Sequence, residues 1–213
     1  MATVKDYKKE YKELYLPKEN PVIVDVPEIR LVGVEGKGSP NDENGEFRDA
    51  IKVLYGIQYT LKMSKKGTHV PCGYFDYVVP PLEAFWWFDD GEDFRCKSKY
   101  NWLAAIRLPE FVNDETFEWA CAEASKKKNI ETRRAKRLTI NEGLCVQCLH
   151  VGSYDDEPKT LKLMDDFMAV NNLKNDINET RRHHEIYLSN PGKTEAARLK
   201  TVLRVPVKII NEK

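Results

Sequence analysis

The spacing of hydrophobic and polar positions changes several times along the 213-residue chain. Apolar residues recur at helical spacing from Phe47 to Leu61 and from Phe117 to Ala124, and Asn113 can cap the second helix. A third helical stripe consists of Leu161, Met164, Phe167 and Met168. Runs of β-branched and apolar residues predict strands at 29–34, 74–79, 102–108, 144–151, 186–188 and 202–207.

The order strand, helix, strand, strand therefore occurs twice, around residues 29–108 and 144–208. This order predicts a single α+β domain over residues 1–213, with half-modules at about 29–110 and 142–210. The two halves would share an antiparallel sheet with helices on one face and a ligand groove at a pseudo-twofold axis. The charged segment 1–20 is predicted to be an N-terminal arm on the surface.

Composition narrows the class of protein. Lys and Arg together number 34, as do Asp and Glu, and this neutral balance argues against a dedicated nucleic-acid binder. The basic stretch 126–137 is interpreted as a solvated helix end and loop rather than as an anion site. We expect a cytoplasmic protein without a membrane segment, because the apolar runs fall short of about 20 residues and the first 20 residues lack a secretory h-region. The odd number of cysteines, five, favours reduced thiols.

The segment His183–Leu188 is a candidate site. Side chains alternate along a strand, so His184, Ile186 and Leu188 share one face, and we expect that face to pack on helices. His183, Glu185 and Tyr187 share the other face. Glu185 could accept a hydrogen bond from a cationic ligand or act as a base for water. Alternatively it pairs with an arginine at the sheet surface, which alternation alone favours.

A second candidate is the aromatic run from Phe85 to Phe88. Adjacent Trp86 and Trp87 suit a flat or cationic ligand, although one core anchor and one interface tryptophan would explain them equally well. Metal and cofactor sites are not expected. Cys145 and Cys148 form a C-x-x-C motif, but residues three apart on a strand face opposite sides. His150 either lines the groove or is a hydrogen-bonded core histidine.

The motifs of the chain resemble those of the stand-alone GyrI-like proteins over essentially its whole length. The stretches that carry the resemblance are KKEYKELYLPKENP, PPLEAFWWFDDG, EGLCVQCLHVGSYDDEP, RRHHEIYLSNP and LKTVLRVPV, in that order. Three positions depart from the family pattern. Ala84 and Phe85 stand where Gly and Leu are usual, and Ser153 stands where we expect Pro.

The resemblance implies a GyrI-like or SOUL-type fold in which Glu185 contacts ligands, with Tyr187 beside it. A subset of the family opens the cyclopropane of DNA-alkylating natural products of the yatakemycin type, using an aromatic cage. The resemblance assigns the cage walls to aromatic side chains, which here would be Phe85, Trp86, Trp87, Tyr55, Tyr59, Trp102 and Phe111, with His150 and His183 as further ligand contacts.

We therefore expect a small aromatic or cationic molecule as partner, bound without a cofactor, and its hydrolysis as a protection for the cell. Glu185 and Tyr187 are the expected catalytic residues. The alternative is a non-catalytic multidrug-binding or sensing protein with the same groove. A third possibility, by fold analogy only, is an interaction module that inhibits an enzyme such as gyrase. The oligomeric state stays open, with a monomer among the possibilities.

Overall fold

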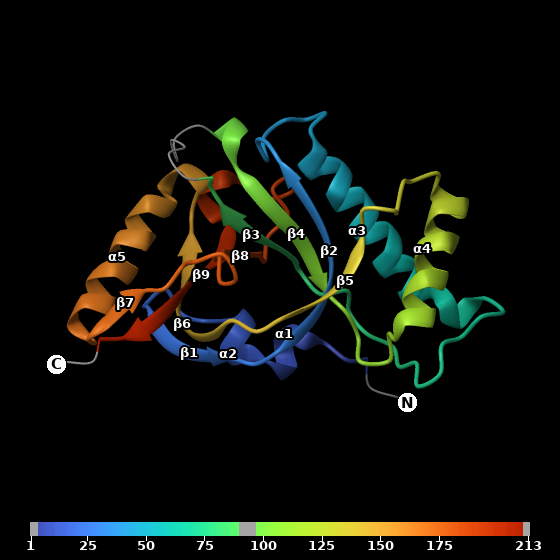
Figure 1. Cartoon of the computed structure of the whole chain (residues 1–213), viewed down its shortest axis with the longest axis horizontal. Helices are drawn as coiled ribbons and strands as arrows, with labels where there is room; N and C mark the ends of the chain where they lie inside the picture. The colour runs from blue at the N-terminus through green and yellow to red at the C-terminus, as the bar shows by residue number, and fades with distance from the viewer. Residues whose placement is uncertain (1–3, 90–96, 211–213) are drawn as a thin grey trace. The chain divides into compact units, whose positions relative to one another are not determined.

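A computed structural model describes residues 4–89 and 97–210 of the chain, which form helices and one large sheet (Figure 1). The α-helices are α1 (Tyr7–Glu10), α2 (Lys12–Tyr15), α3 (Glu46–Met63), α4 (Asp114–Lys128) and α5 (Glu157–Val170). Short 3₁₀ turns lie at Ser64–Lys66, Lys97–Lys99, Tyr154–Asp156 and Ala196–Arg198. The strands are β1 (Val22–Val26), β2 (Ile29–Lys37), β3 (Leu82–Trp87), β4 (Asn101–Arg107), β5 (Lys136–Ile140), β6 (Gly143–Val151), β7 (Leu173–Asn175), β8 (His183–Tyr187) and β9 (Lys200–Ile209).

Within the described residues the strands make one nine-stranded sheet in the order β1-β6-β9-β8-β3-β4-β2-β5, and β7 pairs with β9. The registered pairs, such as β6 with β9 and β8 with β9, are antiparallel. The predicted α+β class with an antiparallel sheet is therefore confirmed.

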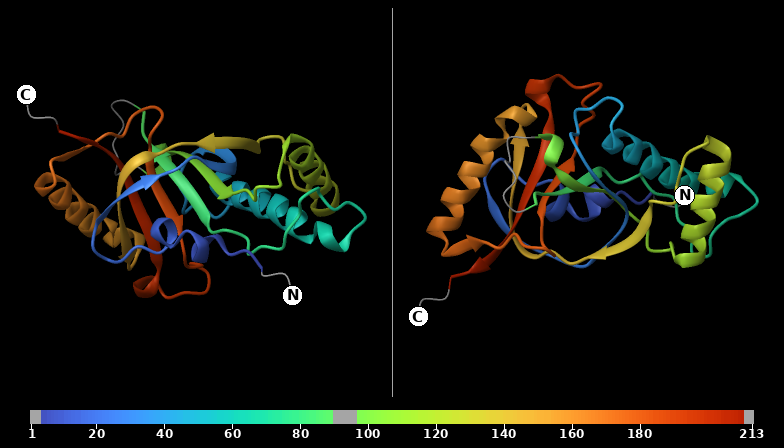
Figure 2. Two further views of the ribbon diagram at one scale, coloured as in Figure 1. Left: turned by 90° about the horizontal axis from the view of Figure 1, so that it is seen from below. Right: turned by 45° about the horizontal axis from the view of Figure 1, so that its top comes forward.

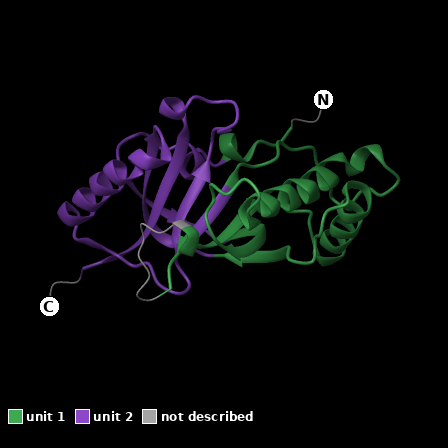
Figure 3. Cartoon of the chain, turned by 90° about the horizontal axis from the view of Figure 1, so that it is seen from above, with its two compact units in different colours: residues 1–10, 29–82, 86–140 green, residues 11–28, 83–85, 141–213 purple. Residues whose placement is uncertain are grey.

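The chain divides into two compact units, which Figure 3 colours separately. Unit 1 contains residues 1–10, 29–82 and 86–140, and unit 2 contains residues 11–28, 83–85 and 141–213. Strand β3 contributes residues to both units. The helices α1, α3 and α4 belong to unit 1, whereas α2 and α5 belong to unit 2.

In unit 1, α3 packs on β2 and β4, and α4 lies beside α3 (Figures 1 and 2). The buried side chains of α3 recur at helical spacing from Phe47 to Leu61, as the sequence predicts. Asn113 caps α4, because its Oδ1 accepts a hydrogen bond from the Thr116 amide at 2.8 Å. Trp102 lies opposite Gly36 in the sheet, and a Cβ at Gly36 would come within 2.3 Å of its indole ring. Only glycine allows that approach.

In unit 2, α5 packs on the sheet through the stripe that its sequence predicts. Met164 and Met168 belong to a buried cluster, with Leu161 and Phe167 packed against it. The strand residues of the cluster are Val146, Cys148, Leu173, Leu203, Val205 and Val207. This cluster defines one face of β6 and β9, which we call the α5 face.

Two expectations about local structure differ from the fold. Residues 74–79 are not a strand, because the phenols of Tyr74 and Tyr77 donate hydrogen bonds to the backbone of α3, to Lys62 O and Gln58 O. The N-terminal segment, which was expected to lie on the surface, forms the helices α1 and α2 with Tyr7, Leu14 and Tyr15 buried. Strands β1, β3, β5 and β7 were not predicted. None of the helices in the described residues is both long and apolar enough to cross a membrane.

Candidate functional site

Strand β8 carries the predicted motif and shows the predicted alternation. His184 and Ile186 are buried, whereas His183, Glu185 and Tyr187 are partly exposed. The strand pairs with β9 in antiparallel register and is followed by β3 in the sheet. Two different environments therefore lie on opposite faces of five consecutive residues.

Glu185 lies on the α5 face. It is directly opposite Leu203, which belongs to the cluster under α5, and directly opposed residues of antiparallel strands project to the same face. The Ile186 face is the one that the short helix α2 approaches, since Arg204 on that face donates to Leu14 O at 2.7 Å. Helix α2 therefore lies on the Ile186 face, where the sequence predicts helices, and the long helix α5 lies on the Glu185 face. Alternation assigns residues to faces, but it does not say which helix covers each face.

The carboxylate of Glu185 has defined partners on both oxygens. The Tyr187 hydroxyl donates a hydrogen bond of 2.7 Å to Oε2, and His183 Nε2 lies 3.3 Å from Oε1. The side chain of Glu185 is 13% exposed, so it retains access to solvent. Two partly exposed polar side chains, those of Tyr187 and His183, thus contact one carboxylate.

Tyr154 extends this cluster, although the sequence analysis did not select it. Its ring lies edge-on to that of Tyr187, with the centroids 6.1 Å apart and the planes at 88°. Burial raises the pKa of Tyr154 to about 12, and the nearby carboxylates of Glu157 and Glu185 act in the same direction. The phenol therefore stays neutral and can donate a hydrogen bond. Its signal in the sequence was its place directly after Ser153, one of the positions that depart from the family pattern.

His150 is buried, and both ring nitrogens have protein partners. Nδ1 is 2.8 Å from Thr160 Oγ1 and Nε2 is 2.9 Å from Ser153 O. These contacts favour the core-histidine interpretation over the groove interpretation. Cys145 and Cys148 take alternate sides of β6, since Cys148 belongs to the α5 face and Cys145 bonds to Glu142 O. Across the described ranges, no group of three or more His, Cys, Asp or Glu is arranged to hold a metal ion.

The predicted cage residues of unit 1 occupy different surroundings. Trp102 is completely buried, and Phe47 packs between it and Trp86, with ring centroids at 5.1 and 5.2 Å. Tyr55 and Tyr59 stack on each other along α3, and Tyr59 is exposed. Phe111 packs against Tyr74, Phe75 and Tyr77, and Trp87 is partly exposed. Among the predicted cage residues, Phe85 belongs to unit 2. Its ring stacks on that of His184, with the ring centroids 3.9 Å apart.

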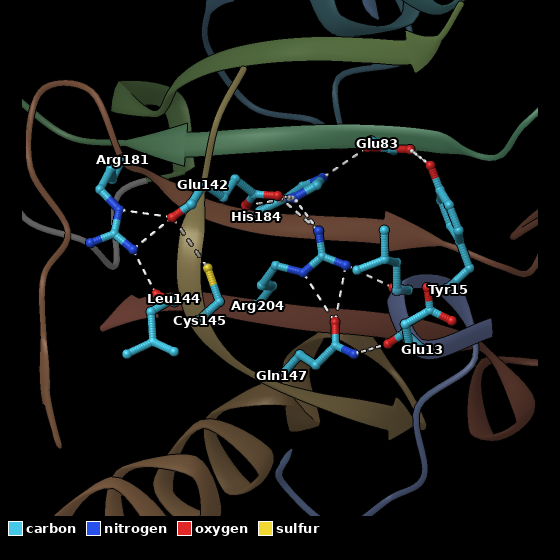
Figure 4. A network of polar contacts seen from close by, with 11 residues as sticks. Glu13, Tyr15, Glu83, Glu142, Leu144, Cys145, Gln147, Arg181, His184 and Arg204 are labelled. Atoms are coloured by element: carbon cyan, nitrogen blue, oxygen red, sulfur yellow. Dashed lines mark hydrogen bonds and ion pairs between the residues drawn. The ribbon is translucent and has the colours of Figure 1, made fainter. Parts of the chain in front are cut away.

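The opposite face of β8 contains a buried charge cluster that the sequence analysis missed. We call Glu83, Glu142, His184 and Arg204 the tetrad; each has at most 5% of its side chain exposed. Figure 4 shows Glu142, His184 and Arg204 pointing toward one another. Glu142 Oε2 lies 3.0 Å from His184 Nδ1, and Glu142 Oε1 accepts a hydrogen bond of 2.8 Å from Arg204. Glu83 Oε2 is 3.1 Å from His184 Nε2.

Neutral groups complete the tetrad's shell. Tyr15 donates to Glu83 at 3.1 Å, and Arg204 donates to the side-chain oxygen of Gln147 at 3.0 Å and to Leu14 O. Burial alone would raise the pKa of Glu142, but His184 and Arg204 outweigh it and hold the pKa at about 2. Burial alone would lower the pKa of His184, but Glu142 and Glu83 outweigh it and raise the pKa. An ionised Glu142 therefore lies between the two cationic side chains of His184 and Arg204.

A signal for the tetrad was present in the sequence. Glu83 is the single charge of β3, and Arg204 lies among apolar residues in the middle of β9; a charge buried in such surroundings requires a partner. Glu83 and Arg204 are 121 residues apart in the chain, and both belong to the cluster around His184, which Glu83 contacts directly and Arg204 reaches through Glu142. The pattern indicates that pairing occurs, but it does not say with which residue.

The chain belongs to the GyrI-like family: the model of the GyrI-like small molecule binding domain matches residues 19–208. Two crystal structures from Listeria innocua, one described as a hydrolase and one as an uncharacterized conserved protein, are each 43% identical to the chain. Each covers 96% of this chain and 100% of its own, with TM-scores of 0.88 and 0.91. EcmrR in a complex with DNA is 13% identical, has a TM-score of 0.53, and covers 95% of this chain and 62% of its own, so it shares the fold alone. Among proteins with curated functions, none matches the chain.

Proposed function

We propose that this protein binds planar aromatic or cationic small molecules beside Glu185 and hydrolyses the cyclopropane of DNA-alkylating natural products, which protects the cell. The observation that carries the proposal is the pairing of Glu185 with Tyr187 at 2.7 Å on the partly exposed face of β8. Two further features support it. The family is a small-molecule-binding one, and one Listeria innocua relative at 43% identity is described as a hydrolase.

The chemistry assigned to Glu185 is that of a general base. Its Oε1 would accept a proton from water while the water oxygen forms a bond to the strained CH₂ carbon. The C–C bond of the cyclopropane breaks, and its electron pair moves into the conjugated carbonyl to give a phenolate, which then takes up a proton. The product is the substrate plus one water, and no oxidant or reductant is needed.

Tyr187 and Tyr154 have complementary tasks in this proposal. The Tyr187 hydroxyl donates to Oε2, so in this proposal the proton of the water goes to Oε1, the oxygen that lies 3.3 Å from His183 Nε2. The face of an aromatic ring carries partial negative charge and stabilises positive character that develops at the carbon under attack. Tyr154, held neutral by its raised pKa, adds a ring and a hydrogen-bond donor beside Tyr187. Ligand contacts for the other predicted aromatic residues, among them Trp86 and Trp87, stay predictions.

The test uses a cyclopropane-bearing alkylator of the yatakemycin class, with liquid chromatography and mass spectrometry to follow the compound. We expect a product heavier by one water over many turnovers, and at least a hundredfold slower formation with Glu185→Gln, on the order of the contribution of a general base. Glu115→Gln, the same change at an exposed glutamate of α4 in unit 1, is the matched control. Unchanged turnover in Glu185→Gln would refute the assigned role.

The second candidate is binding without catalysis, which the negative charge of Glu185 beside two phenols favours equally. It predicts that a planar cationic dye such as rhodamine 6G binds, that Glu185→Gln weakens binding, and that the alkylator is recovered intact. Recovery of intact compound together with dye binding would select this function over hydrolysis.

A further inference from the structure

The tetrad is linked to Glu185 through the backbone of β8. His184 and Glu185 are consecutive in β8, so whatever holds the first side chain on one face places the second on the other. On the tetrad face, His184 has contacts on both sides of β8. Arg204 of β9 and Glu142, which directly precedes β6, lie on one side, and Glu83 of β3 lies on the other, together with the Phe85 ring that stacks on His184.

The charges in the tetrad are specific for one register. His184 and Arg204 lie directly opposite each other in the pairing of β8 and β9, and two cations at such positions repel. Glu142 removes this repulsion because one of its oxygens faces each cation. Since pairing in this register brings two positive side chains together, it is favourable only while Glu142 is ionised and in place.

A slip of one residue would reverse the arrangement. It would exchange the faces of β8, so that His184 would leave the tetrad and Glu185 would enter it. Three carboxylates, Glu83, Glu142 and Glu185, would then be buried around the single cation Arg204. The slipped pairing is strongly disfavoured, because buried charges without partners lose their hydration and gain no compensating contact.

We propose that the buried tetrad of Glu83, Glu142, His184 and Arg204 is a register lock for β8 that positions Glu185, and with it the Glu185–Tyr187 hydrogen bond, at the ligand site. The inference rests on the proposed function of Glu185 as the ligand-contacting carboxylate. The four tetrad residues are positioning residues: they touch neither the ligand nor the reacting atoms. They act through the place that they give to their neighbour.

A double-mutant cycle tests the lock, with rhodamine 6G binding followed by fluorescence anisotropy. We expect Glu142→Gln and Glu185→Gln each to weaken binding by about tenfold, and the double variant to bind no more weakly than Glu185→Gln alone, because both changes act through one group. Losses that multiply to about a hundredfold in the double variant, as for independent sites, would overturn the proposal. So would unchanged binding in Glu142→Gln.

A matched control separates positioning from general stability. Tyr77→Phe removes a buried hydroxyl that bonds to Gln58, entirely within unit 1. We expect this variant to lose stability and to keep its dye affinity. If Tyr77→Phe weakens dye binding as much as Glu142→Gln does, the effect of the tetrad is merely structural and the proposal fails. Should Glu142→Gln not fold, Glu83→Gln takes its place in the same cycle, since it leaves Glu142 between the two cations.

A third readout does not depend on any ligand. The ¹³Cζ chemical shift of Tyr187 reports its hydrogen bond to Glu185 in tyrosine-labelled protein. We expect Glu142→Gln to move this signal toward its position in Glu185→Gln, and Tyr77→Phe to leave it in place. An unmoved signal overturns the lock. If the wild-type protein neither binds the dye nor hydrolyses the alkylator, the proposed function fails, whereas the Tyr187 signal still decides whether the tetrad positions Glu185.

Discussion

The two faces of β8 carry the same kinds of side chain in different surroundings. On one face Glu185 and His183 are 3.3 Å apart, and both retain some exposure. On the other face Glu142 and His184 are 3.0 Å apart, and both are buried. A carboxylate beside an imidazole therefore occurs on each face, but in different dielectric surroundings.

The difference lies in what must satisfy each charge. A buried ion needs its full set of partners from the protein, because water is absent, and the tetrad supplies them with Tyr15, Gln147 and Leu14 O. A partly exposed carboxylate can leave part of its bonding capacity to water or to a ligand. Burial therefore gives the tetrad a structural role, whereas Glu185 keeps the partial exposure that its proposed role requires.

The largest difference expected between the two faces is in their effect on stability. Removing one partner of a buried ion cluster leaves the other charges unpaired, so we expect Glu142→Gln to lower the free energy of unfolding by about 3–5 kcal/mol. The matched change on the other face, Glu185→Gln, should lower it by at most about 1.5 kcal/mol, since one half-exposed hydrogen bond is affected. Urea denaturation followed by circular dichroism measures both. Equal losses would show that the two faces do not differ as burial implies.

The pH dependence of stability sharpens the comparison. The pKa of Glu142 is lowered from 4.5 to about 2, so its contribution is fully present above pH 4.5 and is lost as the pH falls toward 2. The pKa of His184 is raised above 6.5, so its contribution is fully present below pH 6.5 and is lost as the pH rises through the raised value. These two groups therefore give greatest stability between pH 4.5 and 6.5.

Denaturation midpoints measured from pH 2 to pH 9 check this expectation. Glu142→Gln should flatten the acid side of the profile, because the group that titrates there is gone. It should also bring the loss on the basic side to lower pH, because His184 then keeps only Glu83 as a carboxylate partner. A profile that is identical to that of the wild-type protein would show that the tetrad does not control the pH dependence.

The smallest effect is expected for Tyr187→Phe. The variant removes the hydroxyl that donates to Glu185 and retains the ring that Tyr154 meets edge-on. We expect a change of about 0.5–1.5 kcal/mol in unfolding free energy, typical of one hydrogen bond, together with weaker dye binding. Thermal denaturation and fluorescence anisotropy measure the two quantities. A large loss of stability without any change in binding would place Tyr187 among the structural residues instead.

Several features of the fold and site follow from local patterns in the chain. The helical stripes of α3 and α5, the cap at Asn113 and the face assignment in β8 depend on spacing alone, since 3.6 residues make a helical turn and side chains alternate along a strand. The C-x-x-C pair was excluded as a joint ligand by the same alternation. Each of these inferences concerns residues within a few positions of one another.

Features that depend on partners far apart in the sequence could not be predicted in this way. Glu83, Glu142 and Arg204 looked like isolated charges, and only the order of β3, β8 and β9 in the sheet brings them around His184. Segment 74–79 has the composition of a strand, yet its tyrosines bond to α3 instead. Periodicity in a sequence specifies which side of an element each residue takes. What lies on that side depends on long-range pairing, whose energy comes from burial and charge matching between distant segments.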